Sequence, residues 1–264
     1  MNLMPVLPSD RLTRHLLSRP PTRPLADWER EAADTARRVS FRFGLSGLRW
    51  GESGPVALML HGWAGRPTQF ASLVPPLLAA GRQVIALDAP GHGESPGQTG
   101  TLMEFVLTLH EAAAEIRNLE SVVGHSMGGA AAALAVAQGL PADRAVLFAA
   151  PSSIDRQLRG IAERVGLGRR GTDRVLRRME NANGVPVGYF EIPGRVAGME
   201  VPLQVVHDRS DRQVPFEEGE RIAAAWPGAE LISTDGLGHG RVLSDPDVVR
   251  RVTAFLVGRR PRPQ

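Results

Sequence analysis

The sequence contains no cysteine and no lysine. The lack of cysteine among its 264 residues excludes disulfides and cysteine-ligated metal sites, and it says nothing about the cellular compartment. All 31 basic residues are arginine, and against 28 acidic residues they leave a net charge of +3. Because arginine titrates above about 12 and no lysine titrates near about 10.4, this small excess gives the chain a pI of 10.6. The high pI therefore does not indicate a nucleic-acid partner, which would require a clustered basic face, and none is expected.

Long apolar segments are also missing. No uncharged apolar run is long enough for a transmembrane helix, and the N-terminus lacks the continuous apolar segment of a secretory signal. We therefore expect no integral membrane segment and a cytoplasmic location. The length and the hydrophobic content of 42% are typical of one large α/β domain. They do not indicate the oligomeric state.

The N-terminal region differs in composition from the rest of the chain. Residues 1–24 are rich in proline and arginine, and they predict an irregular surface arm with one helical turn near 12–17. The alanines and charges of 26–38 predict a helix. Two short runs at 39–43 and 45–50, separated by a glycine, predict a pair of strands that form a hairpin.

From residue 56 onward, apolar strands alternate with amphipathic helices. Strands are expected at 56–60, 84–87, 121–123, 145–149, 203–206 and 231–232. Helices are expected at about 68–80, 101–116, 130–137, 216–226 and 246–257. Pro75 and Pro76 lie inside the first of these helices and predict a kink or a late start. The alternation implies a mostly parallel sheet covered by helices on both faces.

One stretch, at about 151–198, breaks this alternation and predicts a small helical insertion over the edge of the sheet. Between residues 155 and 178 it holds eight arginines against three acidic residues. These arginines would either recruit an anionic group or form a solvated charged helix face, and the second interpretation is favoured. We therefore expect an N-terminal arm and helix at 1–38 and a main domain at 39–264 that carries this insertion.

The chain is centred on the sequence Gly-His-Ser-Met-Gly-Gly at 124–129, which fits the G-x-S-x-G pattern of a nucleophile elbow. A β-branched run precedes it and a small-residue run follows it, so Ser126 would occupy a tight turn between a strand and a helix. Gly124 and Gly128 leave room for this turn because they carry no Cβ. The alternative is a glycine–serine loop that fits the pattern by chance. Since a serine hydroxyl is a weak nucleophile without a neighbouring base, the other residues must decide.

The candidate base and acid follow Ser126 in the order that this fold type requires, acid first and histidine last. His239 lies in a glycine-rich loop just after the last expected strand, where strand ends converge. For the acid, Asp211 is favoured over Asp208 because it stands further into the loop that precedes a helix. The alternatives are a solvated loop histidine and a turn or capping aspartate.

Two backbone N–H groups are candidates for the oxyanion hole. One belongs to Met127, directly after the nucleophile, and the other to Trp63, in the loop that follows the first buried strand. Gly62 would let this loop approach the substrate. The assignment of Trp63 rests on its position in the loop.

With these residues in place, the sequence resembles the α/β-hydrolase fold family of serine hydrolases. The matching motifs are an HGx loop at 60–63, a D-x-x-G-H-G-x-S loop at 88–95, the GHSMGG elbow at 124–129, an HDxxDxxVP loop at 207–215 and a GH base loop at 238–239.

The resemblance implies an α/β fold with a mostly parallel eight-stranded sheet flanked by helices. It also implies that the insertion, after the sixth strand, acts as a cap over the active site. In this family the second aspartate of the acid loop, here Asp211, is the triad acid. His61, His92 and His125 are then expected to support loops rather than to act as bases. No cofactor and no metal is expected.

The expected activity is hydrolysis of a carboxylic ester, or of a thioester, with a small or medium acyl group, through an acyl-Ser126 intermediate. Serine at the elbow argues against haloalkane dehalogenases and epoxide hydrolases, which resemble this fold but use aspartate there. Amide, lactone, carbon–carbon bond and perhydrolase chemistries share the same residues and remain open. The alternative of another class is a non-enzymatic scaffold that binds a ligand or a partner. The substrate-binding residues stay undefined at this level.

Overall fold

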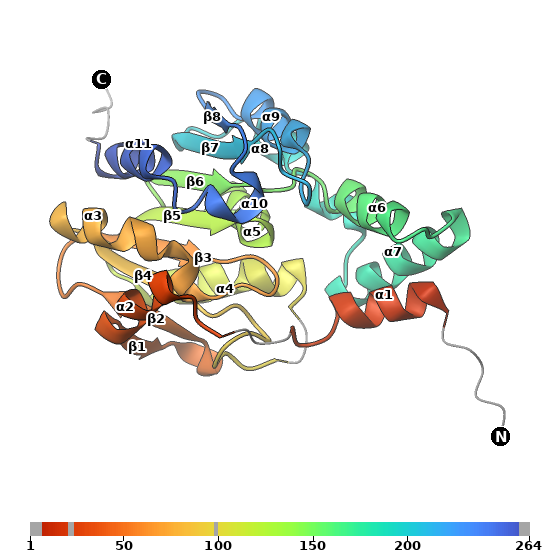
Figure 1. Ribbon diagram of the computed structural model, residues 1–264, viewed down its shortest axis with the longest axis horizontal. Coiled ribbons are helices and arrows are strands. Elements are labelled where there is room, and N and C mark those ends of the chain that lie inside the picture. The colour runs from red at the N-terminus through yellow and green to blue at the C-terminus, as the bar shows by residue number, and fades with distance from the viewer. Residues whose placement is uncertain (1–6, 21–23, 98–99, 259–264) are drawn as a thin grey trace.

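The computed structural model describes residues 7–20, 24–97 and 100–258. Its centre is an eight-stranded sheet in the order β1-β2-β4-β3-β5-β6-β7-β8 (Figure 1). The strands are β1 Arg37–Ser40, β2 Ser46–Trp50, β3 Val56–Leu60, β4 Gln83–Leu87, β5 Leu119–His125, β6 Arg144–Phe148, β7 Leu203–Asp208 and β8 Glu230–Thr234. β1 and β2 form an antiparallel hairpin, and β2 pairs antiparallel with β4. The pairs from β4 through β3 to β8 are parallel, so the predicted α/β fold with a mostly parallel eight-stranded sheet is confirmed.

Helices cover both faces of the sheet, and its central strands are buried as a result. β3, β4, β6 and β7 have no exposed residue, as expected for strands without a solvent face. One face carries α2 Asp27–Thr35, η2 Pro67–Leu73, α3 Val74–Ala79 and α11 Pro246–Val257. The other face carries α4 Leu102–Glu115, α5 Met127–Ala137 and α9 Phe216–Ala225.

The insertion between β6 and β7 is helical, as the sequence indicates. It comprises α6 Ile154–Arg164, α7 Arg169–Asn183, η3 Val187–Phe190 and α8 Pro193–Val196. Figure 1 shows α6 and α7 extending away from the sheet at one end of the molecule. The buried side of α6 carries Ile154, Leu158 and Ala162, that of α7 carries Val175, Leu176 and Met179, and five of the eight arginines of the two helices are exposed. We use the name cap helices for α6 and α7.

The N-terminal region differs from the expected irregular arm. Residues 8–16 form a nine-residue helix, α1 Pro8–Leu16, with a proline in its first turn, where the missing N–H costs nothing. This helix lies against α7, far from the helix α2 that follows it in sequence (Figure 1). Composition did not indicate it because the contact that stabilises it comes from another part of the chain. The ends of the arm, residues 1–6 and 21–23, lie outside the described residues.

Two local expectations are refined by backbone geometry. The first strand of the hairpin spans 37–40 rather than 39–43, because Phe43 takes a left-handed conformation, φ 59°, within a short 3₁₀ turn. The helix expected at 68–80 is a 3₁₀ segment followed by α3, and the change occurs just before Pro75 and Pro76, where a break was predicted.

In the described part of the chain, no helix is long and apolar enough to span a membrane.

Candidate active site

Ser126 lies at the turn between β5 and α5, with φ 55° and ψ −121°. This conformation is strained for a residue with a side chain, and such strain is typical of functional sites. The flanking glycines make the turn possible. A Cβ on Gly124 would lie 2.3 Å from the carbonyl oxygen of Gly128, and a Cβ on Gly128 would lie 2.2 Å from that of Leu60. Only glycine allows the chain segments to approach so closely.

Asp211 and His239 meet across the ends of β7 and β8. The Nδ1 of His239 donates a hydrogen bond of 2.7 Å to Oδ2 of Asp211. The other oxygen of the carboxylate accepts bonds from the backbone N–H groups of Gln213, at 2.7 Å, and Val214, at 3.0 Å. Burial of Asp211 favours the neutral acid, but His239 and these N–H groups outweigh it and lower the pKa of Asp211. Asp211 is therefore a carboxylate held in a fixed orientation toward the imidazole.

The two candidate acids have different surroundings. Asp208 is fully buried and contacts other loops instead of His239. Its carboxylate accepts hydrogen bonds from Ser210, from the Thr234 hydroxyl at 2.6 Å and from the backbone N–H of Leu237 at 3.0 Å. Burial opposes the charged form, but these bonds outweigh it and lower the pKa of Asp208. Asp208 thus ties the loop after β7 to the loop that carries His239.

His239 itself is part of α10, Gly238–Arg241, a single helical turn rather than the flexible loop expected from its glycines. Its ring packs against the ring of His125, with centroids 4.7 Å apart, and its backbone carbonyl lies 2.9 Å from Nε2 of His125. With Nδ1 bound to Asp211, Nε2 is the nitrogen left to accept a proton. The side chain is 11% exposed, which is enough to reach the cavity described next.

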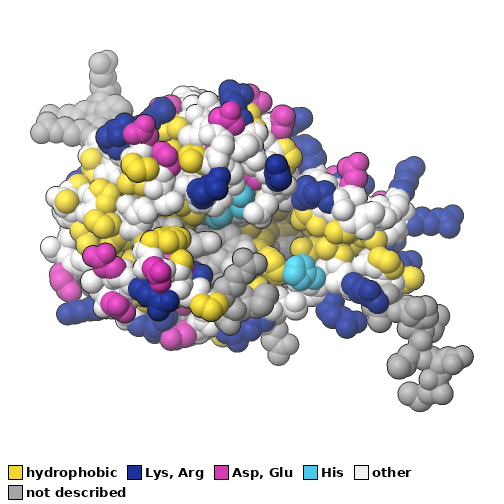
Figure 2. Space-filling view, in the orientation of Figure 1, with side chains coloured by type: hydrophobic (Ala, Val, Ile, Leu, Met, Phe, Trp, Pro, Cys, Tyr) yellow, Lys and Arg dark blue, Asp and Glu magenta, His cyan; other side chains and the backbone are white. Residues whose placement is uncertain are grey.

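Ser126 and His239 line one cavity of about 510 Å³ between the sheet and the cap helices. Figure 2 shows this face of the molecule, where apolar side chains and histidines border a hollow. Neither Ser126 Oγ nor His239 Nε2 makes a hydrogen bond within the described residues, so the two groups share the cavity without a hydrogen bond between them. Hydrogen bonds between catalytic groups are often long or poorly aligned before a substrate binds.

The cavity has an apolar side formed by residues of α1, α4, α5, α6 and α7. These are Leu16, Leu102, Met127, Ile154, Leu158, Ile161 and Met179. The lining also includes Trp63, in the loop after β3, and Gln69 of η2, and the indole Nε1 and the amide Oε1 are both buried without a partner. Within the described ranges, no group of three acidic, histidine or cysteine side chains is arranged to hold a metal ion.

The loop after β3 lies directly against the serine. A Cβ on Gly62 would come within 2.8 Å of Ser126 Cβ and 3.3 Å of its Oγ, so a glycine is needed at this contact. The parallel register that pairs Leu60 with Gly124 brings the two loops together. Among the described residues, the backbone N–H groups of Trp63 and Met127 donate to no protein atom. Both are free to bind an oxygen at this edge of the sheet.

The remaining histidines near the site contact backbone groups of neighbouring loops. Nε2 of His61 accepts from the N–H of Ala89, at 3.1 Å, and Nε2 of His92 accepts from the N–H of Ala64, at 2.9 Å. Burial lowers the pKa of His61 to about 3, with a further contribution from His92. Burial and the adjacent His239 likewise lower the pKa of His125 to about 3. Neutral, hydrogen-bonded rings of this kind brace loops and are poor proton acceptors.

Leu16 and the cap residues were not among the sequence candidates for this site. The leucines of α1 are consistent with any surface helix, and the sequence holds no signal that joins α1 to α7. For α6 and α7 a signal does exist. Their leucines, isoleucine and methionine recur at helical spacing among the arginines, and this pattern marks an apolar face without saying what the face covers.

Comparison with known proteins supports the same assignment of the fold. Residues 57–252 match the model of the alpha/beta hydrolase family. The pimeloyl-[acyl-carrier protein] methyl ester esterase of Xanthomonas campestris is 29% identical over 79% of this chain and 97% of its own length. An esterase of Mycobacterium tuberculosis is 31% identical over 46% of this chain and 42% of its own length.

Several curated relatives are covered over less than half of their length, between 24% and 42%. Among solved structures, an esterase of Pyrococcus furiosus superimposes with a TM-score of 0.67, at 21% identity, over 91% of this chain and 97% of that one. At this identity the superposition supports the fold alone. The family match covers most of the chain and includes every loop that borders the cavity from the sheet side. This chain therefore belongs to the alpha/beta hydrolase family.

Proposed function

We propose that this hydrolase cleaves carboxylic esters, or thioesters, of small or medium acyl groups through an acyl-Ser126 intermediate. One observation carries the proposal. A serine in a strained turn and a histidine that is hydrogen-bonded to a buried carboxylate line the same cavity. In a Ser-His-Asp triad these three groups act as the nucleophile, the base and the acid that orients the base.

In the proposed mechanism, Nε2 of His239 takes the proton of Ser126 as Oγ attacks the ester carbonyl carbon. The imidazolium that forms is stabilised by Asp211, which already accepts the Nδ1 hydrogen bond. Collapse of the tetrahedral intermediate breaks the bond to the leaving alcohol or thiol, which receives the proton from His239. Water, deprotonated by the same histidine, then attacks the acyl-serine and releases the acid.

The N–H groups of Trp63 and Met127 are proposed to bind the oxyanion. They are free of other partners and lie on the two loops that meet at Ser126. Donors that are already oriented need no rearrangement when negative charge develops, and this makes them effective in a site shielded from water. Met127 also opens α5, whose positive dipole end faces the same region.

The apolar side of the cavity supports an acyl substrate rather than a charged one. Leu16, Ile154, Leu158, Ile161 and Met179 lie on α1 and the cap helices, whereas the unpartnered polar atoms belong to Trp63 and Gln69, which follow β3. Relatives named as esterases are consistent with this choice. The scaffold alternative is favoured by one observation, the lack of a hydrogen bond between Ser126 and His239, so the experiment must separate the two functions.

The test is covalent labelling with a fluorophosphonate probe, which reacts with activated serines and needs no knowledge of the substrate. We expect the wild type to be labelled and the Ser126→Ala variant to remain unlabelled. Ser233→Ala, which changes an exposed serine of β8, is the matched control and keeps the label. On any ester that the wild type hydrolyses, Ser126→Ala should lower kcat about 10⁴–10⁶-fold. A folded wild type that takes no label would refute the proposal and favour a scaffold.

A further inference from the structure

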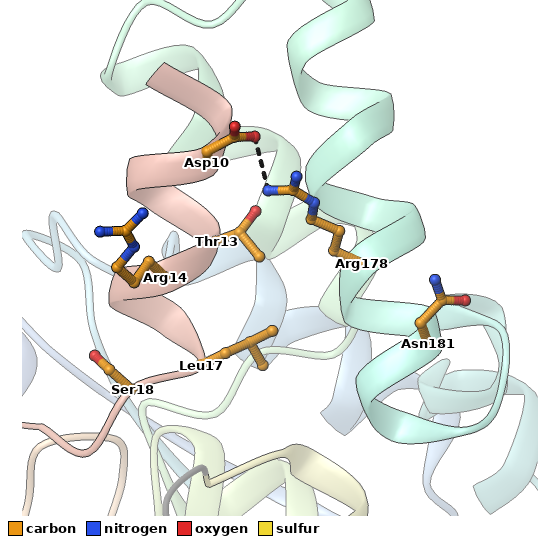
Figure 3. Close-up of a pocket in the computed structure, with 7 residues that line it drawn as sticks. All are labelled: Asp10, Thr13, Arg14, Leu17, Ser18, Arg178 and Asn181. Atoms are coloured by element: carbon orange, nitrogen blue, oxygen red, sulfur yellow. Dashed lines mark ion pairs between the residues drawn. The ribbon is translucent and has the colours of Figure 1, made fainter. Parts of the chain in front are cut away.

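The helix α1 is attached to the cap by polar contacts along one side. Ser9 and Thr13 are buried, and Nη1 of Arg174 donates to the Ser9 hydroxyl at 3.2 Å. Asp10 forms an ion pair of 2.7 Å with Arg178, which Figure 3 shows bridging the two helices. The helix therefore lies beside α7 as an additional cap helix, although six strands, β1 to β6, and the elbow separate the two in sequence.

The C-terminal end of α1 reaches the candidate active site. Leu16 lines the cavity that contains Ser126 and His239. The ring of His15 packs edge-on against the ring of Trp63, with centroids 4.7 Å apart. Trp63 supplies one of the proposed oxyanion donors, so α1 contacts the loop that holds this donor. Farther along, Nη2 of Arg19 donates to the carbonyl of Gly93 at 2.6 Å and fixes the chain after the helix.

Leu16, the last residue of α1, and Leu17, which follows it, face different spaces. Leu16 faces the cavity with the serine, whereas Leu17 lines a separate, open groove between α1 and α7 together with Thr13 and Arg178 (Figure 3). Both side chains are partly buried and pack against the same apolar core. The helix thus offers two leucines of similar burial, one inside the site and one outside it.

We infer that α1 forms a wall of the acyl-binding cavity and that Leu16 limits the bulk of the acyl group. The inference rests on the proposed function. Leu16 lies with Leu158, Ile161 and Met179 on the apolar side of the cavity, so it meets the part of the substrate that carries no charge. In an apolar pocket, the addition or removal of one methylene changes discrimination by about 10–200-fold. A change at Leu16 should therefore alter selectivity between acyl groups rather than the chemistry at Ser126.

The test compares labelling rates with two fluorophosphonates, one with an ethyl and one with a long alkyl chain, for wild type, Leu16→Ala, Leu16→Trp and Leu17→Ala. Leu16→Ala should raise the ratio of long-chain to ethyl labelling about tenfold, and Leu16→Trp should lower it by a similar factor. Leu17→Ala, the matched control, should leave the ratio within about twofold of wild type. Thermal melting of each variant checks that α1 and the body remain folded.

The possible results separate this inference from the proposed function. A labelled wild type with the same ratio in Leu16→Ala and Leu16→Trp would overturn the role of Leu16 and leave the serine chemistry intact. Equal shifts in Leu16→Ala and Leu17→Ala would also overturn it, because they would reflect loosening of α1 rather than contact with the acyl group. A wild type that takes no label would overturn the proposed function, and the acyl role of Leu16 with it.

Discussion

The sheet side of the site and its cap side are held in place by different forces. On the sheet side, Asp208, Asp211, His61 and His125 are buried and hydrogen-bonded to residues at or beyond the ends of β4, β7 and β8. On the cap side, α1, α6 and α7 contribute apolar side chains to the cavity and expose arginines on their outer surface. The sheet side fixes the groups that would react, while the cap side shapes the space that they share.

This difference has an energetic consequence. A buried polar group that loses its partner costs about 1–3 kcal/mol, whereas an exposed ion pair contributes about 0.2–1 kcal/mol. Substitutions on the sheet side should therefore affect activity and stability strongly. Substitutions on the cap side should change selectivity between acyl groups with little loss of activity or stability.

The largest of these effects is expected at Asp211. Asp211→Asn keeps the shape of the side chain but removes the charge that stabilises the imidazolium and holds the Nδ1 proton of His239 in place. We expect kcat to fall about 10⁴-fold, as when the acid of another serine triad is replaced by its amide. The measurement is ester hydrolysis by purified variant and wild type, with circular dichroism to show that the fold persists.

Asp208→Asn is the control for this variant. Asp208 accepts bonds from Thr234 and Leu237, so the amide disturbs the anchoring of the loop that carries His239. Its main effect should be a loss of about 1–3 kcal/mol in the free energy of unfolding, with an activity loss at least a hundredfold smaller than that of Asp211→Asn. The opposite ranking of activities would identify Asp208 as the acid.

Acid should destabilise the sheet side through its buried histidines. The pKa of His61 and that of His125 are lowered to about 3 in the folded chain, whereas an unfolded histidine titrates near about 6.5. Below that value the unfolded chain binds protons that the folded chain excludes, so stability falls as the pH drops from about 6.5 toward 3. Between about pH 7 and 5.5, these two residues together should remove about 2–3 kcal/mol of unfolding free energy.

Urea unfolding at the two pH values measures this loss together with that from His92 and His207, whose pKa values burial also lowers. Asp208 and Asp211 do not contribute to it, because their pKa values are lowered and both remain ionised in this range. His15→Gln, in the exposed histidine of α1, is the cap-side control and should leave the loss unchanged. If the free energy of unfolding were constant from pH 7 to 5.5, the buried rings would have to be charged or open to water in the folded chain.

The same contrast explains which parts of the structure could be predicted from the sequence. The alternation of strands and helices from residue 56 onward and the loops at 60–63, 88–95 and 124–129 follow from local chemistry, whereas the order of the strands in the sheet was not predicted. An apolar run buried on both faces indicates a strand, and the glycines that allow tight contacts stand in the sequence itself. The meeting of Asp211 with His239 was also predicted, because both follow strands whose ends converge.

The position of α1 could not be predicted, since it depends on contacts between residues far apart in the chain. Ser9, Asp10 and Thr13 look like residues of any surface helix until Arg174 and Arg178 are placed beside them. Proline and arginine content indicated an arm, whereas docking against α7 produced a helix. The arginines of α7 illustrate the same limit, because two of them act as partners for α1 and their identity gives no sign of it.

The smallest effect is expected at the tip of the cap, where α1 meets α7. Asp10→Asn removes the ion pair with Arg178, whose side chains are 29% and 42% exposed, and should cost less than about 1 kcal/mol. The matched variant at the base of the cap is Glu218→Gln. Glu218 is buried and accepts bonds from the N–H and hydroxyl of Ser152 and from Nε of Arg156.

Loss of that buried charge should cost about 1.5–3 kcal/mol, because hydrogen bonds to charged groups are the stronger ones. Urea unfolding at low and at 0.5 M salt measures both variants. Salt should abolish the small difference between Asp10→Asn and wild type, since exposed pairs are screened, and it should leave most of the Glu218→Gln effect. If Asp10→Asn proved as costly as Glu218→Gln, α1 would be an integral part of the folded core, and the division between a rigid sheet side and an adjustable cap side would not hold at this helix.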